Sequence, residues 1–385
     1  MNKETPRLNF TGNSELPDLE LNCLAMLNGM PIHLPESTLE QLLELAQEQG
    51  VVPLLHHQLQ ATSSSAKAPE ALMEKLHAQA TLEAATELAR NHELRQVLTA
   101  LADGGIQPLL MKGTPLAYLI YPSPTLRPRC DTDLLFPITD KENTIHILTA
   151  LGYQFPNAVS GNFVRLQATC IKKEKNGFMH QLDLHWKISN QPYFAGILLY
   201  EELTKNALSV PELGSHARTL ALADALLFAC LHRAGHAAEG EGNRLIWLYD
   251  IHLLCEALTA NELEYFIGQA RTHRVAALCL DALEQTQLRF HTRLSDTILS
   301  QLKDSSSQPE PSARYLQKSR LAQFKCNLAL LPTTMDKLAY MGETLFPSQS
   351  YILTKYKTRN RLLLPLLYLH RFILGCKKQI WRKEQ

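Results

Sequence analysis

Two long stretches with helical periodicity enclose a segment in which the apolar runs are only long enough for strands. Apolar residues recur at helical spacing from 36 to 100, and they do so again beyond Ser209. Between these stretches, residues 106–111 and 132–136 are short apolar runs of strand length. This alternation predicts an α+β fold, in which a small mixed sheet is flanked by N-terminal and C-terminal helical regions.

Loop and turn residues divide the chain further. A helix is expected to stop at Gly50, and the segment TSSSAKAP that follows the next apolar run is expected to be a loop. Residues 162–187 predict a β-hairpin that turns at Asn176-Gly177, and the stretch SSSQPEPS at 305–312 predicts an exposed linker. We therefore expect three regions. They are a helical region at 1–105, an α/β core at 106–200, and a helical region at 201–385 with a linker near 304–312.

Three helix boundaries in and before the core carry recognisable signals. An apolar pattern that begins at Glu70 is expected to end at Asp103-Gly104-Gly105. Thr139 and Glu142 form a capping-box pattern, which predicts a helix that ends near Gly152.

The third boundary follows the first predicted strand. Gly113 is expected to end that strand, Thr114 to be the N-cap of the next helix, and Pro115 to be its first residue. A glycine before a helix start lets an anion approach free backbone N–H groups. The sequence therefore predicts a phosphate site here.

Charge and cysteine content exclude several classes of protein. Lys plus Arg equals Asp plus Glu at 38 each, so the net charge favours no particular partner. The eight cysteines are scattered without a Cys-x-x-Cys pair, which argues against a zinc ribbon or a disulfide framework and favours buried thiols. The sequence has neither the apolar run of a signal peptide nor the roughly 18 apolar residues of a membrane helix, so we expect a cytoplasmic protein.

The tail from Tyr351 combines basic and apolar residues. It contains nine Lys or Arg and one Glu, interleaved with the apolar stretch LLLPLLYLHRFIL. Contact with an anionic membrane or a nucleic acid is one interpretation. The preferred one is that the apolar residues pack as one or two final helices with the charges in solvent, and that Pro365 breaks any single continuous helix.

Two carboxylates stand one residue apart at the start of a predicted buried strand. Because alternate strand residues share a face, Asp131 and Asp133 are expected to point the same way. Two carboxylates at that spacing repel each other unless a cation lies between them, and Mg²⁺ (or Mn²⁺) accepts such oxygen ligands. A two-metal site needs a third carboxylate. The candidate is Asp183, which is expected to share a strand face with Gln181 and His185 while the intervening residues form the apolar face.

Three basic residues lie close to this pattern in sequence. Lys112, Arg127 and Arg129 are candidates for charge-assisted contacts with a triphosphate. Other interpretations stay open. Lys112 could be a surface lysine at a strand end, and each arginine could be solvated or pair with a carboxylate.

Taken together, these motifs resemble the nucleotidyltransferase superfamily of the DNA polymerase β type. The resemblance is closer to a family of uncharacterised nucleotidyltransferases, and it spans roughly residues 20–375. The motifs that carry it are Met111-Lys112-Gly113, Tyr121-Pro122, an arginine, Asp131-Thr132-Asp133-Leu134-Leu135, Asp183-Leu184-His185-Trp186, HRAGH, RLIWLYDI and LLLPLLYLHR. Gly-Thr replaces the superfamily's usual Gly-Ser. The spacing from Gly113 to Asp131 is longer than usual for the superfamily, although the closer family shares it.

The resemblance implies roles for these residues. Asp131 and Asp133 would bind divalent ions, and Asp183 would complete the metal site and favour deprotonation of an acceptor hydroxyl. Gly113 and Thr114 would hold the terminal phosphates of a nucleoside triphosphate such as ATP. The implied reaction is in-line attack on the α-phosphate with release of pyrophosphate.

Several questions stay open at this point. His232 and His236 lie four residues apart on one helix and are expected to be a packed or hydrogen-bonded pair with a structural or substrate-side role, while His185 is expected to support Asp183. The acceptor could be a small molecule, a protein side chain or, with least support, a nucleic acid. The rival hypotheses are a binding module without turnover and a membrane-surface accessory protein of a biosynthetic pathway. The sequence identifies neither the base of the nucleotide nor the oligomeric state.

Overall fold

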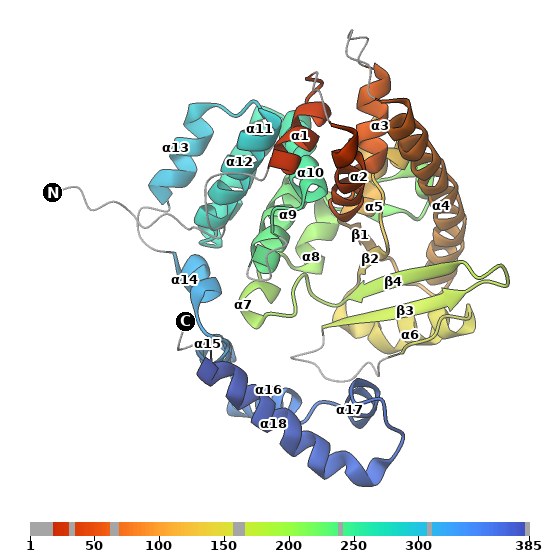
Figure 1. Cartoon of the computed structure of the whole chain (residues 1–385). Helices are drawn as coiled ribbons and strands as arrows, with labels where there is room; N and C mark the ends of the chain where they lie inside the picture. Colours follow the sequence, from red (N-terminus) through yellow and green to blue (C-terminus); the bar gives the residue numbers. More distant parts are fainter. Residues whose placement is uncertain are drawn as a thin grey trace.

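The computed structural model describes residues 18–30, 35–61, 69–156, 166–237, 242–305 and 310–381. In this part of the chain a mixed sheet lies between helices from both halves of the sequence (Figure 1). Its strand order is β3-β4-β2-β1-β6-β5. The strand bounds are β1 Leu109–Met111, β2 Thr132–Leu135, β3 Gln167–Lys173, β4 Met179–His185, β5 Leu208–Ser209 and β6 Arg218–Thr219. The predicted α+β class is confirmed.

Strand direction brings distant segments together at the centre of the sheet. Strand β2 pairs antiparallel with β1 and parallel with β4, while β6 pairs parallel with β1. Strands β3 and β4 form the predicted hairpin, and Gly177 in its turn has a φ of 91°. Residues 162–165 of the predicted hairpin lie outside the described residues.

Helices occupy most of the remaining chain. The N-terminal group is α1 Asp18–Leu27, α2 Leu39–Glu48, α3 Val52–Ala61 and α4 Glu70–Asp103. Within the core are α5 Gly113–Leu119, α6 Lys141–Ala150, α7 Pro192–Ala195 and α8 Tyr200–Leu203. The C-terminal group is α9 Leu222–Ala237, α10 Leu245–Ala257, α11 Ala260–Thr272, α12 Ala276–Phe290, α13 Asp296–Ser305, α14 Pro311–Gln317, α15 Arg320–Leu330, α16 Thr334–Leu345, α17 Gln349–Lys355 and α18 Leu364–Trp381.

Each face of the sheet packs into a different apolar core. Leu110 and Leu134 point into a core with Leu98 of α4 and Trp186 after β4. On the other face, Leu109, Met111 and Leu135 join a larger core to which the N-terminal and C-terminal helices both contribute. Because strand residues alternate between faces, Asp133 points to the same side as Leu135, towards the helices of the larger core.

Most helix boundaries follow the sequence signals. Helix α2 ends before Gly50, which has a φ of 71°, and α4 ends at Asp103 with Gly105 at a φ of 77°. The loop predicted after α3 falls mostly on residues 62–68, which lie outside the described residues.

The starts of β1 and α6 were predicted wrongly. The first strand begins at Leu109 rather than residue 106, because the Ile106 N–H bonds back to the Leu101 carbonyl and so completes the end of α4. Thr139 does not cap α6. It lies in a 3₁₀ turn at Ile138–Asp140 and donates to Asp140 Oδ1 at 3.1 Å, and the helix begins at Lys141.

The buried face of the long helix α4 carries acidic side chains in addition to the apolar ones that the sequence predicted. Leu82 and Leu88 are exposed, whereas Glu87 and Glu93 are buried. Glu93 accepts hydrogen bonds from Tyr153 Oη at 3.1 Å and from Lys172 Nζ at 2.8 Å. The face of α4 that covers the sheet is therefore partly polar.

The sequence predicted a helical chain beyond Ser209, and this prediction is wrong for one short segment. A two-residue strand, β6, extends the sheet beside β1, with Leu110 opposite Thr219. Thr219 also donates its hydroxyl to the Leu110 carbonyl at 2.8 Å. A strand this short carries no periodicity, which is why only its place in the sheet identifies it.

The linker predicted at 305–312 is not exposed at its C-terminal end. Glu310 and Ser312 are buried, and the Glu310 carboxylate accepts hydrogen bonds from the backbone N–H groups of Ala276 and Ala277 at 3.1 and 2.8 Å. Glu310 therefore satisfies two free N–H groups in the first turn of α12. Residues 306–309 lie outside the described residues.

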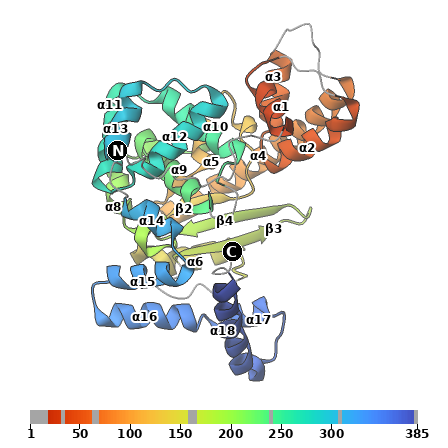
Figure 2. The ribbon, with the colours of Figure 1, turned by 60° about the vertical axis from the view of Figure 1, so that its left-hand side comes forward.

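Helices α16, α17 and α18 form a C-terminal arm that extends from the rest of the molecule (Figures 1 and 2). The tail forms two separate helices, α17 and α18, as predicted. Pro365 is the second residue of α18, where its missing N–H removes no helical hydrogen bond. The expected burial is wrong for several apolar residues of the tail. Leu362 is 87% exposed and Leu366 is 63% exposed.

None of the helices in the described residues is long and apolar enough to cross a membrane. The described cysteines are free thiols, and five of them are buried as predicted. Cys130 is exposed.

Candidate active site

Strands β2 and β4 place three aspartates at one cavity. Asp133 and Asp183 are register partners on adjacent parallel strands, and Asp131 precedes β2 by one residue. All three line a single cavity of about 690 Å³. The face alternation predicted for β4 is confirmed, since Leu182 and Leu184 are buried in the sheet core while Asp183 is half-buried on the other face.

The neighbouring carboxylates change the pKa of Asp131. Burial, followed by the charges of Asp133 and Asp183, raises the pKa of Asp131 to about 6. A side-chain hydrogen bond between Asp131 and Asp183 contributes in the same direction. Asp183 Oδ1 is buried and has no hydrogen-bond partner. A buried carboxylate oxygen without a partner is costly, so this atom is poised to accept a proton or a cation.

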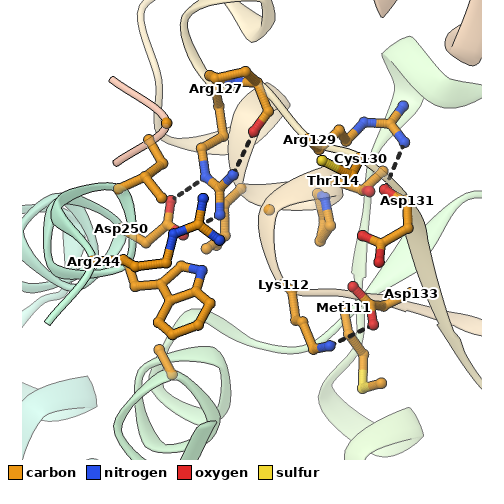
Figure 3. Close-up of a pocket in the computed structure, with 18 of the residues that line it drawn as sticks. Met111, Lys112, Thr114, Arg127, Arg129, Cys130, Asp131, Asp133, Arg244 and Asp250 are labelled. Carbon is orange, nitrogen blue, oxygen red and sulfur yellow. Dashed lines mark hydrogen bonds and ion pairs between the residues drawn. The ribbon is translucent and has the colours of Figure 1, made fainter. Parts of the chain in front are cut away.

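Asp133 is held differently. Its Oδ1 accepts a hydrogen bond from Lys112 Nζ at 2.6 Å (Figure 3). The same oxygen accepts a second hydrogen bond from His185 Nε2 at 2.8 Å. Although burial opposes it, the charge of Lys112 and the hydrogen bond from His185 hold the pKa of Asp133 well below its usual range. Asp133 is thus ionised, and His185 contacts Asp133 rather than the Asp183 for which the sequence had suggested it.

The donor set suits a hard divalent cation. Three carboxylates supply the oxygen ligands that Mg²⁺ and Mn²⁺ prefer, and Asp183 Oδ1 has a free acceptor position. Among the residues that the structure describes, no three histidine, cysteine or acidic side chains already converge closely enough to enclose an ion. The ion pair between Lys112 and Asp133 shares the Asp133 oxygen that a cation would use. Occupation by an ion therefore requires Lys112 to give up part of this contact.

The turn between β1 and α5 differs from the predicted helix start. Lys112 has a φ of 57° and is the N-cap, so Gly113 is the first helical residue and Thr114 the second. Thr114 is consequently not the N-cap, and Pro115 is the third residue of the helix rather than the first. The positive φ turns the chain sharply and lets Lys112 extend to Asp133.

The lack of a side chain at Gly113 leaves room for the side chain of Arg127. A Cβ atom at position 113 would lie 2.7 Å from Arg127 Cζ and under 3.0 Å from both terminal guanidinium nitrogens. The guanidinium of Arg127 therefore packs directly on Gly113. The bare Cα accommodates this buried arginine, and an anion that approached Gly113 would meet the arginine there.

Arg127 is fixed by a carboxylate from the C-terminal half. Its Nε and Nη2 donate to the two oxygens of Asp250 at 2.8 and 2.7 Å (Figure 3). Tyr121 Oη also donates to Asp250 Oδ1, at 2.6 Å. Despite its burial, this pairing raises the pKa of Arg127 above its usual range. Of the interpretations left open by the sequence, pairing with a carboxylate describes Arg127 in this structure.

Arg129 is fixed by the N-terminal half in a similar way. Its Nε donates to Glu87 Oε2 at 2.9 Å and its Nη2 to Glu87 Oε1 at 3.1 Å. Its Nη1 donates to the Asp131 carbonyl at 3.2 Å and to the Thr132 hydroxyl. Arg129 thereby positions the backbone that carries Asp131. Both arginines line the cavity.

The side of the cavity formed by the C-terminal helices is aromatic and basic. His232 and His236 of α9 have ring centroids 4.7 Å apart, and Trp247 of α10 packs against both at 4.7 and 5.1 Å. Burial, followed by the charge of Lys112, lowers the pKa of His232 well below its usual range. The two histidines are therefore a packed aromatic pair, as the sequence predicted.

Arg244 adds a cation to this wall. Its guanidinium lies over the Trp247 ring at 5.2 Å, and its Nη2 donates to the Glu48 carbonyl at 3.0 Å. Arg244 Nε is buried without a hydrogen-bond partner. Figure 3 shows this arginine on the side of Asp250, across from Asp131 and Asp133.

Sequence reasoning missed Arg244 and Glu87 and assigned no site role to Trp247. The stretch RLIWLYDI places Trp247 in the first turn of a helix and Arg244 just before it, but its helical pattern alone does not say that these residues meet a cavity. Glu87 is one of many acidic residues on α4 and has no distinguishing local signal.

The fold and the cavity thus define an α+β protein with an acidic, ligand-sized site between its sheet and its helices. Residues 35–291 match the family described as uncharacterised nucleotidyltransferase, and the chain belongs to that family. The match ends before α13, so it extends less far than the resemblance predicted from the sequence. No curated protein matches the chain.

Proposed function

We propose that the chain transfers a nucleoside monophosphate from a nucleoside triphosphate to a hydroxyl group, with Mg²⁺ or Mn²⁺ and with release of pyrophosphate. The observation that carries this proposal is the pairing of Asp133 with Asp183 on adjacent strands, where Asp183 Oδ1 has no partner. Membership of the nucleotidyltransferase family supports the class of reaction. A cavity of about 690 Å³ is large enough for a nucleotide.

Each carboxylate has a separate part in this proposal. Asp131, Asp133 and Asp183 would hold the divalent cations, which supply charge stabilisation for the attacking and leaving oxygens. Asp183, whose Oδ1 has a free acceptor position, would receive the proton of the acceptor hydroxyl. The acceptor oxygen forms a bond to the α-phosphorus, the bond from that phosphorus to the bridging oxygen breaks, and its electron pair leaves with pyrophosphate.

Basic groups around the acids would bind the phosphates. Lys112, already 2.6 Å from Asp133, would move its contact to a phosphate oxygen when a cation binds the carboxylate. Gly113 and Thr114 would supply backbone N–H groups, with the Arg127 guanidinium beside them. Arg129 would act chiefly by holding the Asp131 backbone, through its hydrogen bond of 3.2 Å to that carbonyl.

The acceptor is proposed to be a small molecule or a protein hydroxyl. The cavity is lined by residues from three parts of the chain and has aromatic and cationic groups on the side of α9 and α10. We assign that side to the acceptor or to the base of the nucleotide, and the sheet side to the triphosphate. His232 and His236 would then contact a substrate through their rings.

The rival function is binding of a nucleotide without turnover. The ion pair of Lys112 with Asp133 is the observation that favours it, because this contact neutralises a carboxylate that catalysis would need. The two functions differ in whether pyrophosphate is released.

The experiment incubates the full chain with each α-labelled nucleoside triphosphate, Mg²⁺ or Mn²⁺ and cell extract, and then identifies whatever acquires the label. We expect one labelled acceptor and an equal amount of pyrophosphate. Replacing Asp131 or Asp133 by Asn should lower the rate by at least about a hundredfold because a cation ligand is lost. Asp183→Asn should lower the rate similarly but change nucleotide affinity little.

The matched control is Asp103→Asn, since Asp103 is an exposed aspartate at the end of α4. Its rate should equal that of the unmodified protein. All variants should keep the circular dichroism spectrum and melting temperature of a folded chain. Full activity in Asp131→Asn and Asp133→Asn would refute the metal assignment, and nucleotide binding without pyrophosphate release across all acceptors would favour the rival function.

A further inference from the structure

The C-terminal arm carries a row of exposed apolar side chains along one side of α18. The row begins in the 3₁₀ turn Arg361–Leu363 and continues along the helix with spacings of four, three and four residues, which places its members on one helical face. Its members are Leu362, Leu366, Leu369 and Ile373. Leu369 is 55% exposed, so even the middle of the row lacks cover from the rest of the chain.

The other side of α18 is already occupied by the arm itself. Tyr368 Oη donates to the Pro347 carbonyl at 2.5 Å, and Arg371 Nη1 donates to the Thr344 carbonyl at 3.1 Å. Leu364 and Ile352 are buried within the arm. These contacts fix the orientation of α18, so the row is held outward rather than left free to turn inward.

Helix α16 of the same arm has a second exposed apolar row. Its members are Met335, Leu338, Met341 and Leu345, and Phe346 follows them. The spacing of three, three and four residues again gives one helical face. Contiguous apolar surface of this kind marks an interaction site in a folded protein.

The charged residues that flank the apolar row of α18 in the sequence have one sign. Lys355, Lys357, Arg359 and Arg361 are exposed and lead directly into Leu362. No acidic residue occurs between Glu343 and Glu384, whereas nine basic residues do. A second copy of the arm would bring the same positive charge against itself, which disfavours pairing of two arms.

We propose that the arm binds the surface of an anionic lipid bilayer, with the apolar row of α18 inserted at the headgroup level and the cations of residues 355–361 on the lipid phosphates. An interfacial helix combines an exposed apolar face with Lys and Arg beside it, and the two features act together. The helix lies on the bilayer and does not cross it, consistent with the absence of a spanning helix from the described residues. This inference is independent of the proposed nucleotidyl transfer, because the family match ends at residue 291.

The test measures sedimentation of the full chain with phosphatidylcholine vesicles that contain or lack phosphatidylglycerol. We expect binding to the anionic vesicles, weak binding to the neutral ones, and loss of binding as salt screens the charges. Leu366→Ser with Leu369→Ser, and separately Lys357→Glu with Arg359→Glu, should each weaken binding to anionic vesicles about tenfold or more.

The matched control replaces two exposed leucines outside the arm, Leu88→Ser with Leu288→Ser, and should bind like the unmodified chain. Nucleotidyl transfer without vesicles should be the same in all these variants, because none of the changed residues lines the cavity. Failure of the unmodified chain to sediment with anionic vesicles at low salt would overturn the proposal. Unchanged binding by Leu366→Ser with Leu369→Ser would also overturn it, as would a dimer that this pair of substitutions dissociates.

Discussion

At the residue scale, the site depends on how three carboxyl groups share one cavity. Asp133 Oδ1 accepts hydrogen bonds from Lys112 and His185, whereas Asp183 Oδ1 is buried without a hydrogen-bond partner. The environments therefore push the pKa values of neighbouring aspartates in opposite directions, down for Asp133 and up for Asp131. Such divergence within one cavity is typical of functional sites.

The raised pKa of Asp131 predicts how cation binding depends on pH. Below about 6 the folded protein keeps a proton on this carboxyl, and a cation that binds there must displace it. Affinity for Mn²⁺ should therefore fall as the pH falls, by about tenfold per pH unit below about pH 6. The electron paramagnetic resonance signal of free Mn²⁺ measures this affinity directly.

Asp131→Asn is the control for this pH dependence. The variant has no proton to lose at position 131, so its weaker affinity should vary less over the same range. If the unmodified chain bound Mn²⁺ equally at about pH 5 and about pH 7, Asp131 would not be a ligand.

At the scale of elements, the start of α5 is shaped by an arginine from the loop that follows it. The guanidinium of Arg127 occupies the space where a side chain at position 113 would begin. The guanidinium of Arg127 cannot move away without breaking its two hydrogen bonds to Asp250. The glycine, the arginine and the aspartate therefore form one structural unit, although they lie far apart in the sequence.

Gly113→Ala should consequently destabilise the protein. The added Cβ would lie 2.7 Å from Arg127 Cζ and would push the guanidinium away from Asp250. We expect the free energy of unfolding to fall by about 2–4 kcal/mol, as measured by urea denaturation. Gly268→Ala is the matched control, since it lies inside α11 with no atom within 4 Å of the new Cβ, and it should be neutral or slightly stabilising. Equal stability of Gly113→Ala and the unmodified chain would contradict this packing.

At the scale of the whole molecule, buried ion pairs connect the sheet to both helical regions. Arg127 pairs with Asp250 of α10, and Arg129 pairs with Glu87 of α4. Both arginines come from the loop between α5 and β2, which also leads into Asp131. The two helical regions therefore hold the same loop, one through Asp250 and the other through Glu87.

Loss of the Asp250 carboxylate tests this connection. Asp250→Ala leaves Arg127 buried without its partner and removes the acceptor of Tyr121 Oη, so the free energy of unfolding should fall by about 3–5 kcal/mol. Urea denaturation followed by circular dichroism is the measurement. Glu44→Ala, a change at an exposed acidic residue of α2, should stay within about 0.5 kcal/mol of the unmodified chain. An unchanged denaturation midpoint for Asp250→Ala would show that this ion pair does not hold the regions together.

Local signals in the sequence determined much of the architecture. Periodicity gave the α+β class, most helices and the hairpin, because each depends on residues that are close in the chain. Alternation along β4 predicted which face carries Asp183, and the spacing of Asp131 and Asp133 predicted a shared side of β2. These features follow from backbone geometry alone.

Only the tertiary structure decided the pairings that complete the site. The sequence left open whether Lys112 and the two arginines pair with carboxylates or stay free. The outcome depended on which acids the fold brought beside them. Glu87 and Asp250 come from different helices, α4 and α10. The outward orientation of Leu362 and Leu366 likewise depended on what the rest of the chain left uncovered. Side-chain patterns set local geometry, whereas burial and long-range pairing arise only when distant segments occupy the same space.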